Sequence, residues 1–285
     1  MCGIVYRKSL ENRNISFDVL QLYKNQRNRG SDGFGFFDPN NKKLIHKTDE
    51  KDIVRKLKNY NTTEMLYHHR FPTSTKNVQN ACHPFKVTID NVDYFVVHNG
   101  YLSNDYELKE KHEKKGFKYS SNQPDGSFND SESLAIDLAL YLSGKQRKLY
   151  SKGVVAFIVY TKDALYFGRN SNPLYCHIND KNITIRSEGK GFLIDSNTLY
   201  TLKNNKLTKR KLLIPEYEYT KTTYDYNGYY PYSDYYYQKE QIQNAINLAE
   251  NRLDNAYYRN DTKEIDAEIN LIEELRAELY DYYEL

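Results

Sequence analysis

Short apolar runs separated by polar breaks cover the first 205 or so residues of this 285-residue chain. Runs of about four to eight residues rich in β-branched and aromatic side chains, with turn residues between them, are typical of strands. We therefore expect strands over these ranges: 3–6, 34–37 after the glycine-rich turn at 29–33, 43–47, 64–70, 94–98, 153–160, 164–168, 174–178, 183–187 and 199–202. Apolar residues at helical spacing predict helices at 17–26 and 130–143. Runs of strands with a few helices between them favour a layered α+β arrangement over alternating βαβ units.

The composition changes near residue 216. Residues 216–238 are dominated by Tyr with Asp, Glu and Lys, which indicates a linker or a surface segment. Residues 239–258 and 262–283 each carry an apolar stripe at helical spacing, so they predict a helical hairpin whose stripes are buried within the chain or against a partner. The expected organisation is a main domain at 1–212, a Tyr-rich segment at 213–238 and a helical hairpin at 239–285.

Composition and charge exclude several classes of protein. With 39% hydrophobic and 28% charged residues and a mean hydropathy of -0.85, no stretch approaches the ~18 apolar residues of a membrane span. A net charge of +3 is too small and too evenly spread to indicate a nucleic-acid partner. Three cysteines and the absence of a signal peptide argue against a disulfide framework and favour a cytoplasmic protein.

Cys2 directly follows the initiator methionine. Removal of Met1 would expose an α-amino group, whose pKa of ~7.7 to 8 leaves a useful fraction unprotonated near neutral pH. One residue would then hold both a thiol nucleophile and its base. Cys82 and Cys176 lack this placement, and we expect them to be small buried thiols.

Six short motifs follow one another along the chain: Met-Cys-Gly-Ile at 1–4, Arg-Gly-Ser-Asp-Gly at 29–33, His-His-Arg-Phe-Pro-Thr at 68–73, Asn-Ala-Cys-His-Pro-Phe at 80–85, His-Asn-Gly at 98–100 and Asn-Asp-Ser-Glu at 129–132. In this order they resemble the class II glutamine amidotransferase domain, an N-terminal-nucleophile hydrolase. The resemblance covers about residues 2–205. It implies a four-layer αββα sandwich of two antiparallel sheets between helical layers, to which this chain adds the C-terminal helical hairpin.

The resemblance also implies a reaction. Cys2 would attack the side-chain carbonyl of glutamine, and its own amino group would pass the thiol proton to the departing ammonia. Asn99 and the backbone N–H of Gly100 would hold the oxyanion of the intermediate. The products would be glutamate and ammonia.

Further positions would hold the substrate by the same resemblance. Arg70, assisted by Thr73, would bind the α-carboxylate, and Asp130 would receive the α-ammonium group. Arg29 would order the glycine-rich turn and line the pocket, although a turn salt bridge with Asp32 is nearly as good an interpretation. His98 would orient the Asn99 loop rather than act as a base.

Two points of this assignment have alternatives. Asp130 or Ser131 could serve only as the N-cap of the helix that begins there. Ser74 and Thr75 stand where the family often has His or Thr and then Gly, so part of the carboxylate pocket is in doubt.

We expect neither a metal nor a cofactor. His68, Cys82 and His83 match no zinc-binding spacing. The roughly 80 residues after the domain contain no phosphate-binding loop and no dinucleotide fingerprint, so an ammonia acceptor would lie on a separate synthase subunit. A free-standing γ-glutamyl amidohydrolase and a non-catalytic binding or scaffold protein that keeps the fold remain as alternatives.

Overall fold

The computed structural model describes residues 2–71, 75–215 and 262–281 and the helical positions 242, 246, 249, 250 and 253. The chain divides into two compact units, Met1–Tyr219 and Thr220–Leu285. Thr73 lies outside the described residues, as does the Tyr-rich segment from residue 216 to its end.

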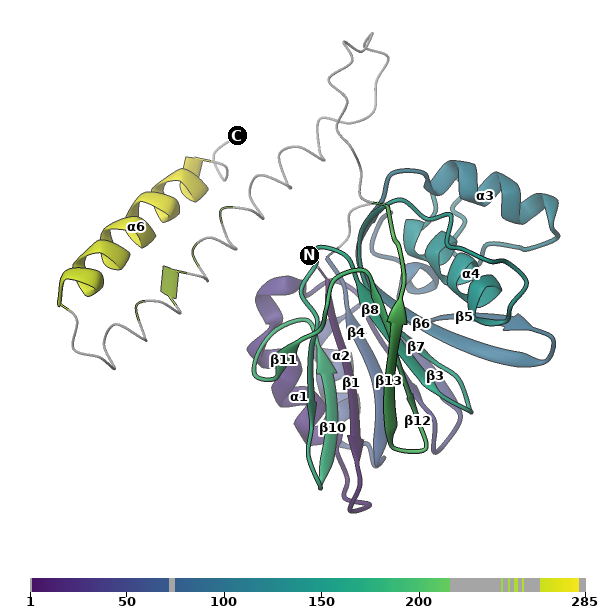
Figure 1. Ribbon diagram of the computed structural model, residues 1–285, viewed down its shortest axis with the longest axis horizontal. Coiled ribbons are helices and arrows are strands. Elements are labelled where there is room, and N and C mark those ends of the chain that lie inside the picture. Colours follow the sequence, from purple (N-terminus) through teal and green to yellow (C-terminus); the bar gives the residue numbers. More distant parts are fainter. Residues whose placement is uncertain are drawn as a thin grey trace, which may run out of the picture. The chain divides into compact units, whose positions relative to one another are not determined.

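Two antiparallel sheets form the centre of the first unit (Figure 1). The first sheet has the order β11 (Phe192–Leu193), β9 (Tyr175–Ile178), β10 (Asn182–Arg186), β1 (Gly3–Ser9), β4 (Glu64–His69), β2 (Phe34–Asp38), β3 (Lys43–Lys47). The second sheet has the order β13 (Lys206–Lys211), β12 (Thr198–Lys203), β8 (Leu165–Arg169), β7 (Gly153–Tyr160), β6 (Val92–Leu102), β5 (Phe85–Ile89).

Helices cover the outer face of each sheet. On the first sheet lie α1 (Ser16–Asn25) and α2 (Glu50–Lys58), and on the second lie α3 (Asp105–Lys114) and α4 (Asp130–Leu142). Single 3-10 turns occur at η1 (Arg27–Arg29) and η2 (Gln79–Ala81). The predicted four-layer αββα sandwich is confirmed.

The alternation of side chains along the central strands explains the layering. In β1, Ile4 and Tyr6 enter the core between the sheets, whereas Val5 faces the core under α1 and α2. In β6, Phe95 and Val97 enter the core between the sheets. Because both faces of such strands are buried, the strands appear in the sequence as continuous apolar runs.

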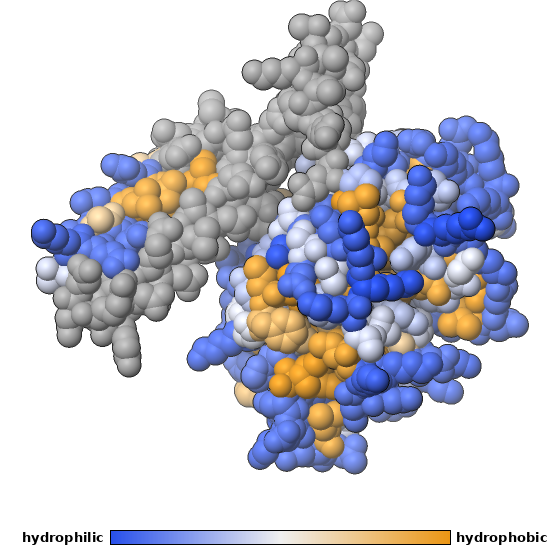
Figure 2. Space-filling view, in the orientation of Figure 1, coloured by the Kyte–Doolittle hydropathy of each residue, from blue (hydrophilic) through white to orange (hydrophobic). Residues whose placement is uncertain are grey.

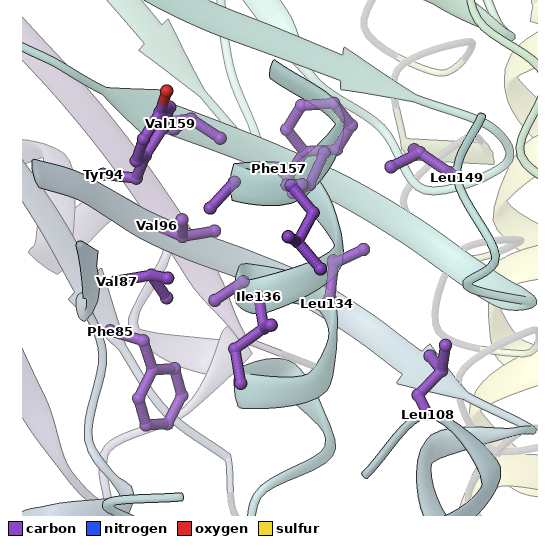
Figure 3. Packing of buried hydrophobic residues seen from close by; sticks show 14 of the residues in the cluster. Phe85, Val87, Tyr94, Val96, Leu108, Leu134, Ile136, Leu149, Phe157 and Val159 are labelled. Atoms are coloured by element: carbon purple, nitrogen blue, oxygen red, sulfur yellow. The ribbon is translucent and has the colours of Figure 1, made fainter. Parts of the chain in front are cut away.

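The third core lies between the second sheet and α4. Leu134 and Ile136 of α4 pack with Phe85, Val87 and Val96 of β5 and β6 (Figure 3). Every buried residue of this core comes from positions 85 to 214. Among the described residues, the buried members of all three cores of the first unit come from that unit itself.

Five elements were not expected from the sequence: α2, α3, β5, the two-residue strand β11, and β13. Only two residues of each helix are buried, Ile53 and Leu57 in α2, and Leu108 and His112 in α3. In α3 this leaves little helical periodicity, whereas in α2 the buried residues Ile53 and Leu57 lie one turn apart on an otherwise polar helix, a pattern that does predict a helix. β13 is an exposed edge strand rich in Lys and Arg, a composition that discourages pairing with other chains.

The second unit contains α6 (Thr262–Asp281). Ile242, Ile246 and Ala249 form a buried cluster with Ile272 of α6, and Glu250 pairs with Arg276 at 2.8 Å. Figure 2 shows the apolar stripe along α6 between polar flanks. The two predicted stripes thus pack in part against each other. No helix in the described ranges is long and apolar enough to cross a membrane.

The division into units changes the interpretation of charge. Met1–Tyr219 contains 35 Lys and Arg against 24 Asp and Glu, and Thr220–Leu285 contains 6 against 14. The expectation of an even spread was therefore wrong, because two units of opposite formal charge sum to a small net value.

Candidate active site

Cys2 lies where the two sheets approach each other at the start of β1. Its backbone N donates to Oδ1 of Asn99 in β6 at 3.1 Å, which joins the first sheet to the second. Its Sγ lies 3.7 Å from the carbonyl oxygen of Phe71, which directly follows Arg70. Cys2 is partly exposed, whereas Cys82 and Cys176 are buried. Burial raises the pKa of both buried thiols, that of Cys176 to about 12, which suits inert core residues.

Gly3 permits the close approach of a histidine to the nucleophile. Gly3 stands opposite His69 in the pairing of β1 with β4, and a Cβ at Gly3 would lie 1.9 Å from His69 Nε2. Burial lowers the pKa of His69 to about 3, and the nearby charge of Arg29 acts in the same direction. His69 therefore packs beside the terminus as an uncharged ring.

Asn99 is fully buried and is held at two points. Its Oδ1 accepts from Cys2, and its carbonyl oxygen accepts from Asn172 Nδ2 at 2.9 Å. Its Nδ2 has no hydrogen-bond partner among the described residues. Gly100 has a φ of +144°, and a Cβ there would lie 1.8 Å from Val154 O, so only glycine fits. A buried amide donor thus lies next to the nucleophile, on a backbone that requires glycine.

His98 connects β6 to the first turn of α4. Its backbone N donates to His83 Nδ1 at 3.3 Å, and its ring Nδ1 lies 2.8 Å from Ser131 Oγ. Burial lowers the pKa of His98 to about 4, so the ring is neutral near pH 7. A neutral ring bonded in this way links the Asn99 segment to the first turn of α4, and the orienting role of His98 stays a prediction.

Arg70 directly follows β4 and is buried. Its Nη1 donates to Lys76 O at 3.0 Å, and its Nη2 donates to Thr75 Oγ1 at 2.6 Å and to Thr75 O at 3.1 Å. Burial lowers the pKa of Arg70, and the neighbouring charges of Cys2 and Asp130 oppose that shift. Three residues predicted to act together are therefore close enough to interact electrostatically.

Asp130 is the first residue of α4, and its Oδ2 accepts from Leu102 N at 2.9 Å. The N-cap of this helix is Asn129, whose Oδ1 accepts from Ser131 N at 3.0 Å. The alternative that Asp130 or Ser131 is the cap was therefore wrong. Asp130 also helps to raise the pKa of Asp105 to about 6, after the larger effect of burial.

Arg29 reaches the nucleophile from η1. Its Nε donates to Cys2 O at 3.2 Å, and its Nη1 lies 3.8 Å from Glu188 Oε2. The sequence left open a turn salt bridge with Asp32, but the ion pair in the structure joins Arg29 to Glu188 in the loop after β10.

Sequence reasoning missed four groups at this site: the carbonyl of Phe71, Asn172, Ser187 and Glu188. Each contacts a partner at least 69 residues away in the chain. Phe71 lies within the motif at 68–73 but was given no role, and the other three lie outside every motif that the sequence singled out. No cluster of three or more His, Cys, Asp or Glu suited to a metal ion occurs among the described residues.

No protein-family model matches the chain. It is 25% identical over 279 residues to glutamine–fructose-6-phosphate aminotransferase (isomerizing) of Francisella tularensis subsp. tularensis (strain SCHU S4). This alignment covers 86% of this chain and 44% of the relative. It is 22% identical over 223 residues to the protein of the same name from Sulfolobus acidocaldarius, and this alignment covers 73% of this chain and 36% of the relative. The chain thus spans less than half the length of these relatives.

A solved structure has the same fold. Glutamine phosphoribosylpyrophosphate amidotransferase from B. subtilis, solved with ADP and GMP, superimposes with a TM-score of 0.55 at 15% identity, over 74% of this chain and 49% of that one. In the order of its motifs, in its fold and in its relatives, the first unit is similar to class II glutamine amidotransferase domains.

Proposed function

We propose that this chain hydrolyses the side-chain amide of glutamine through a thioester on Cys2 and that the ammonia passes to an acceptor on another protein. The observation that best supports this is the contact between Cys2 and Asn99. Asn99 uses Oδ1 to hold the nucleophilic residue and keeps a buried Nδ2 donor without a partner among the described residues. A donor placed beside a nucleophile is what an oxyanion hole requires.

The reaction begins once Met1 has been removed. Cys2 Sγ attacks the amide carbon, and its proton moves to the α-amine of the same residue. The negative charge on the substrate oxygen is stabilised by Asn99 Nδ2 and the N–H of Gly100. The C–N bond then breaks, and the amine delivers the proton to the leaving nitrogen, which departs as ammonia. Water, deprotonated by the same amine, attacks the thioester and releases glutamate and the free thiol.

Charged groups around Cys2 suit the other end of glutamine. Arg70 provides a buried guanidinium whose charge interacts with both Cys2 and Asp130. A guanidinium matches a carboxylate with two parallel hydrogen bonds, and a carboxylate matches an ammonium group. We therefore assign the α-carboxylate of glutamine to Arg70, with Thr73 assisting, and the α-ammonium group to Asp130.

The test combines intact mass with turnover. The purified protein should lack Met1 and should gain one adduct on Cys2 from 6-diazo-5-oxo-L-norleucine, a glutamine analogue that alkylates such nucleophiles. Cys2→Ala should lose both the adduct and glutamate formation. Cys176→Ala is the matched control, because this thiol is buried between the sheets, and the variant should keep both. The proposal would be refuted by a wild-type protein that retains Met1, or by a Cys2→Ala variant that still turns over glutamine.

A further inference from the structure

The loop between β10 and β11, residues 187–191, is fixed to the strand that follows the nucleophile. Ile4 N donates to Ser187 Oγ at 3.0 Å, and Ser187 N donates to Ile4 O at 3.1 Å. This reciprocal pair lies two residues from Cys2. A displacement of the loop would therefore be transmitted to the start of β1.

Arg186, the last residue of β10, also contacts the backbone of this loop. Its Nη2 donates to Lys190 O at 2.9 Å. A Cβ at Gly189 would lie 2.6 Å from Arg186 Cζ, so the loop backbone passes very close to the guanidinium. Glu188 lies between these two fixed points, and the loop geometry determines where its carboxylate is held.

Glu188 is the link between this loop and Cys2. Its Oε2 has no hydrogen-bond partner among the described residues and lies 3.8 Å from Nη1 of Arg29, so the two form a long ion pair. Arg29 Nε in turn donates to Cys2 O at 3.2 Å. The Arg29 side chain is 4% exposed and that of Glu188 is 34% exposed. A guanidinium this deeply buried needs a negative partner, because desolvation of an unpaired charge is costly. Glu188 meets this need from the solvent side.

The charges that face Cys2 are dominated by arginine. Arg29 contacts its carbonyl, and Arg70 interacts with its thiol. Asp130 and Asp32 balance Arg70, whereas the Glu188 carboxylate faces two guanidinium groups, those of Arg29 and of Arg186. His69, on β4, is uncharged near neutral pH. Positive charge favours a thiolate and disfavours a protonated amine, so the Glu188 carboxylate acts against both effects.

On the basis of the proposed function, we propose that Glu188 is a positioning residue. It keeps Arg29 against the carbonyl of Cys2 and balances the charge of Arg29 beside the terminal amine. Glu188 touches neither the nucleophile nor the substrate in this role. It acts through Arg29.

Glu188→Gln tests the proposal in the full-length protein. Loss of the carboxylate should move the acidic limb of kcat/KM for glutamine to lower pH by about half a pH unit. The pH dependence of Cys2 alkylation by iodoacetamide, followed by mass spectrometry, should move the same way. Arg29→Gln removes the opposite charge and should move both profiles to higher pH. Glu188→Asp retains the charge and should restore most of the wild-type profile.

Asp180→Asn is the matched control. It makes the same change in net charge at an exposed position in the turn before β10, at the opposite end of that strand from Glu188. The proposal would be overturned if the pH profiles of Glu188→Gln coincided with those of Asp180→Asn and of the wild type. Alkylation needs no glutamine turnover. Absence of glutaminase activity in the wild type would therefore refute the proposed function, while the alkylation profiles would still decide the role of Glu188.

Discussion

The two polar atoms of the Asn99 side chain have separate tasks, and a substitution can separate them. Asn99→Asp keeps an oxygen that accepts from Cys2 N, which in the structure bonds to Oδ1 at 3.1 Å. It replaces the buried Nδ2 donor with an oxygen that repels the developing oxyanion. We expect kcat for glutamine to fall by ~100 to 1000-fold, the usual loss for one oxyanion-hole donor, with a smaller change in KM.

Steady-state kinetics on Asn99→Asp and Asn99→Ala provide the measurement, with near-UV circular dichroism to verify packing. Both variants lose the donor, whereas only Asn99→Ala also loses the contact with Cys2. An Asn99→Asp enzyme that keeps more than about a tenth of the wild-type kcat would rule out Nδ2 as an oxyanion donor.

Individual site residues differ in how well the sequence reveals them. Cys2, Asn99 and Asp130 lie within short motifs whose residue types already suit the chemistry. Glu188 and Asn172 do not, because their importance comes from contacts with Arg29 and with the Asn99 carbonyl. Those contacts exist only after segments 73 or more residues apart have been brought together by the sheets.

Among the elements, most of the central strands were predictable because burial on both faces makes them continuous apolar runs. The helices α2 and α3 were not predicted; α3 is mostly charged with only two buried residues, whereas α2 carries a clear amphipathic pattern. β5 should have been found, because its buried and exposed residues alternate strictly, with Phe85, Val87 and Ile89 facing the core. In β5 and in α2 a usable periodicity was overlooked, whereas in α3 the signal itself was weak.

The N-terminus of α4 positions Asp130, and Asn129 fixes that terminus. Asn129 Oδ1 caps the helix, and its Nδ2 donates to Ala81 O at 2.8 Å. Asn129→Ala removes both bonds in a buried place, so we expect a loss of about 2 to 3 kcal/mol in the free energy of unfolding. We also expect a higher KM for glutamine, because Asp130 would be less firmly placed.

Asp49→Ala serves as the comparison in urea unfolding and kinetics. Asp49 caps α2 by accepting from Asp52 N at 3.1 Å, and it lies in an exposed position outside the set of site residues. Its loss should cost about 1 kcal/mol and leave KM unchanged. Equal effects of the two substitutions on stability and KM would contradict the argument that the Asn129 cap positions Asp130.

For the whole molecule, the sequence placed the end of the main domain at residue 212, whereas the compact units divide after Tyr219. Leu212 and Ile214 are buried in the core under α4, and Pro215 O accepts from Gly153 N at 3.1 Å. The sequence does not reveal these contacts, because an apolar residue near the end of a domain has the same local pattern whether it packs against the core or not. A fragment meant to preserve the first unit should therefore extend at least through Pro215.

Buried histidines give the whole molecule a characteristic response to acid. Burial lowers the pKa of His69 to about 3 and those of His98 and His112 to about 4, and it also lowers those of His68 and His83. In the unfolded chain each histidine has a pKa near 6.5. Between these values the unfolded state binds more protons than the folded state, so stability is full above about pH 6.5 and falls as the pH drops.

We predict that the free energy of unfolding in urea decreases steeply from pH 7 to pH 5. For each buried histidine the slope grows from about 0.3 kcal/mol per pH unit at pH 7 toward about 1.4 kcal/mol per pH unit near pH 5. Asp105, with its pKa raised to about 6, acts in the opposite direction, but it is a single group. His112→Gln, a substitution in α3 outside the proposed catalytic and substrate-binding groups, should reduce the slope by about one histidine's share. A free energy of unfolding that stays constant from pH 8 to pH 5 would show that these rings are not buried as neutral groups.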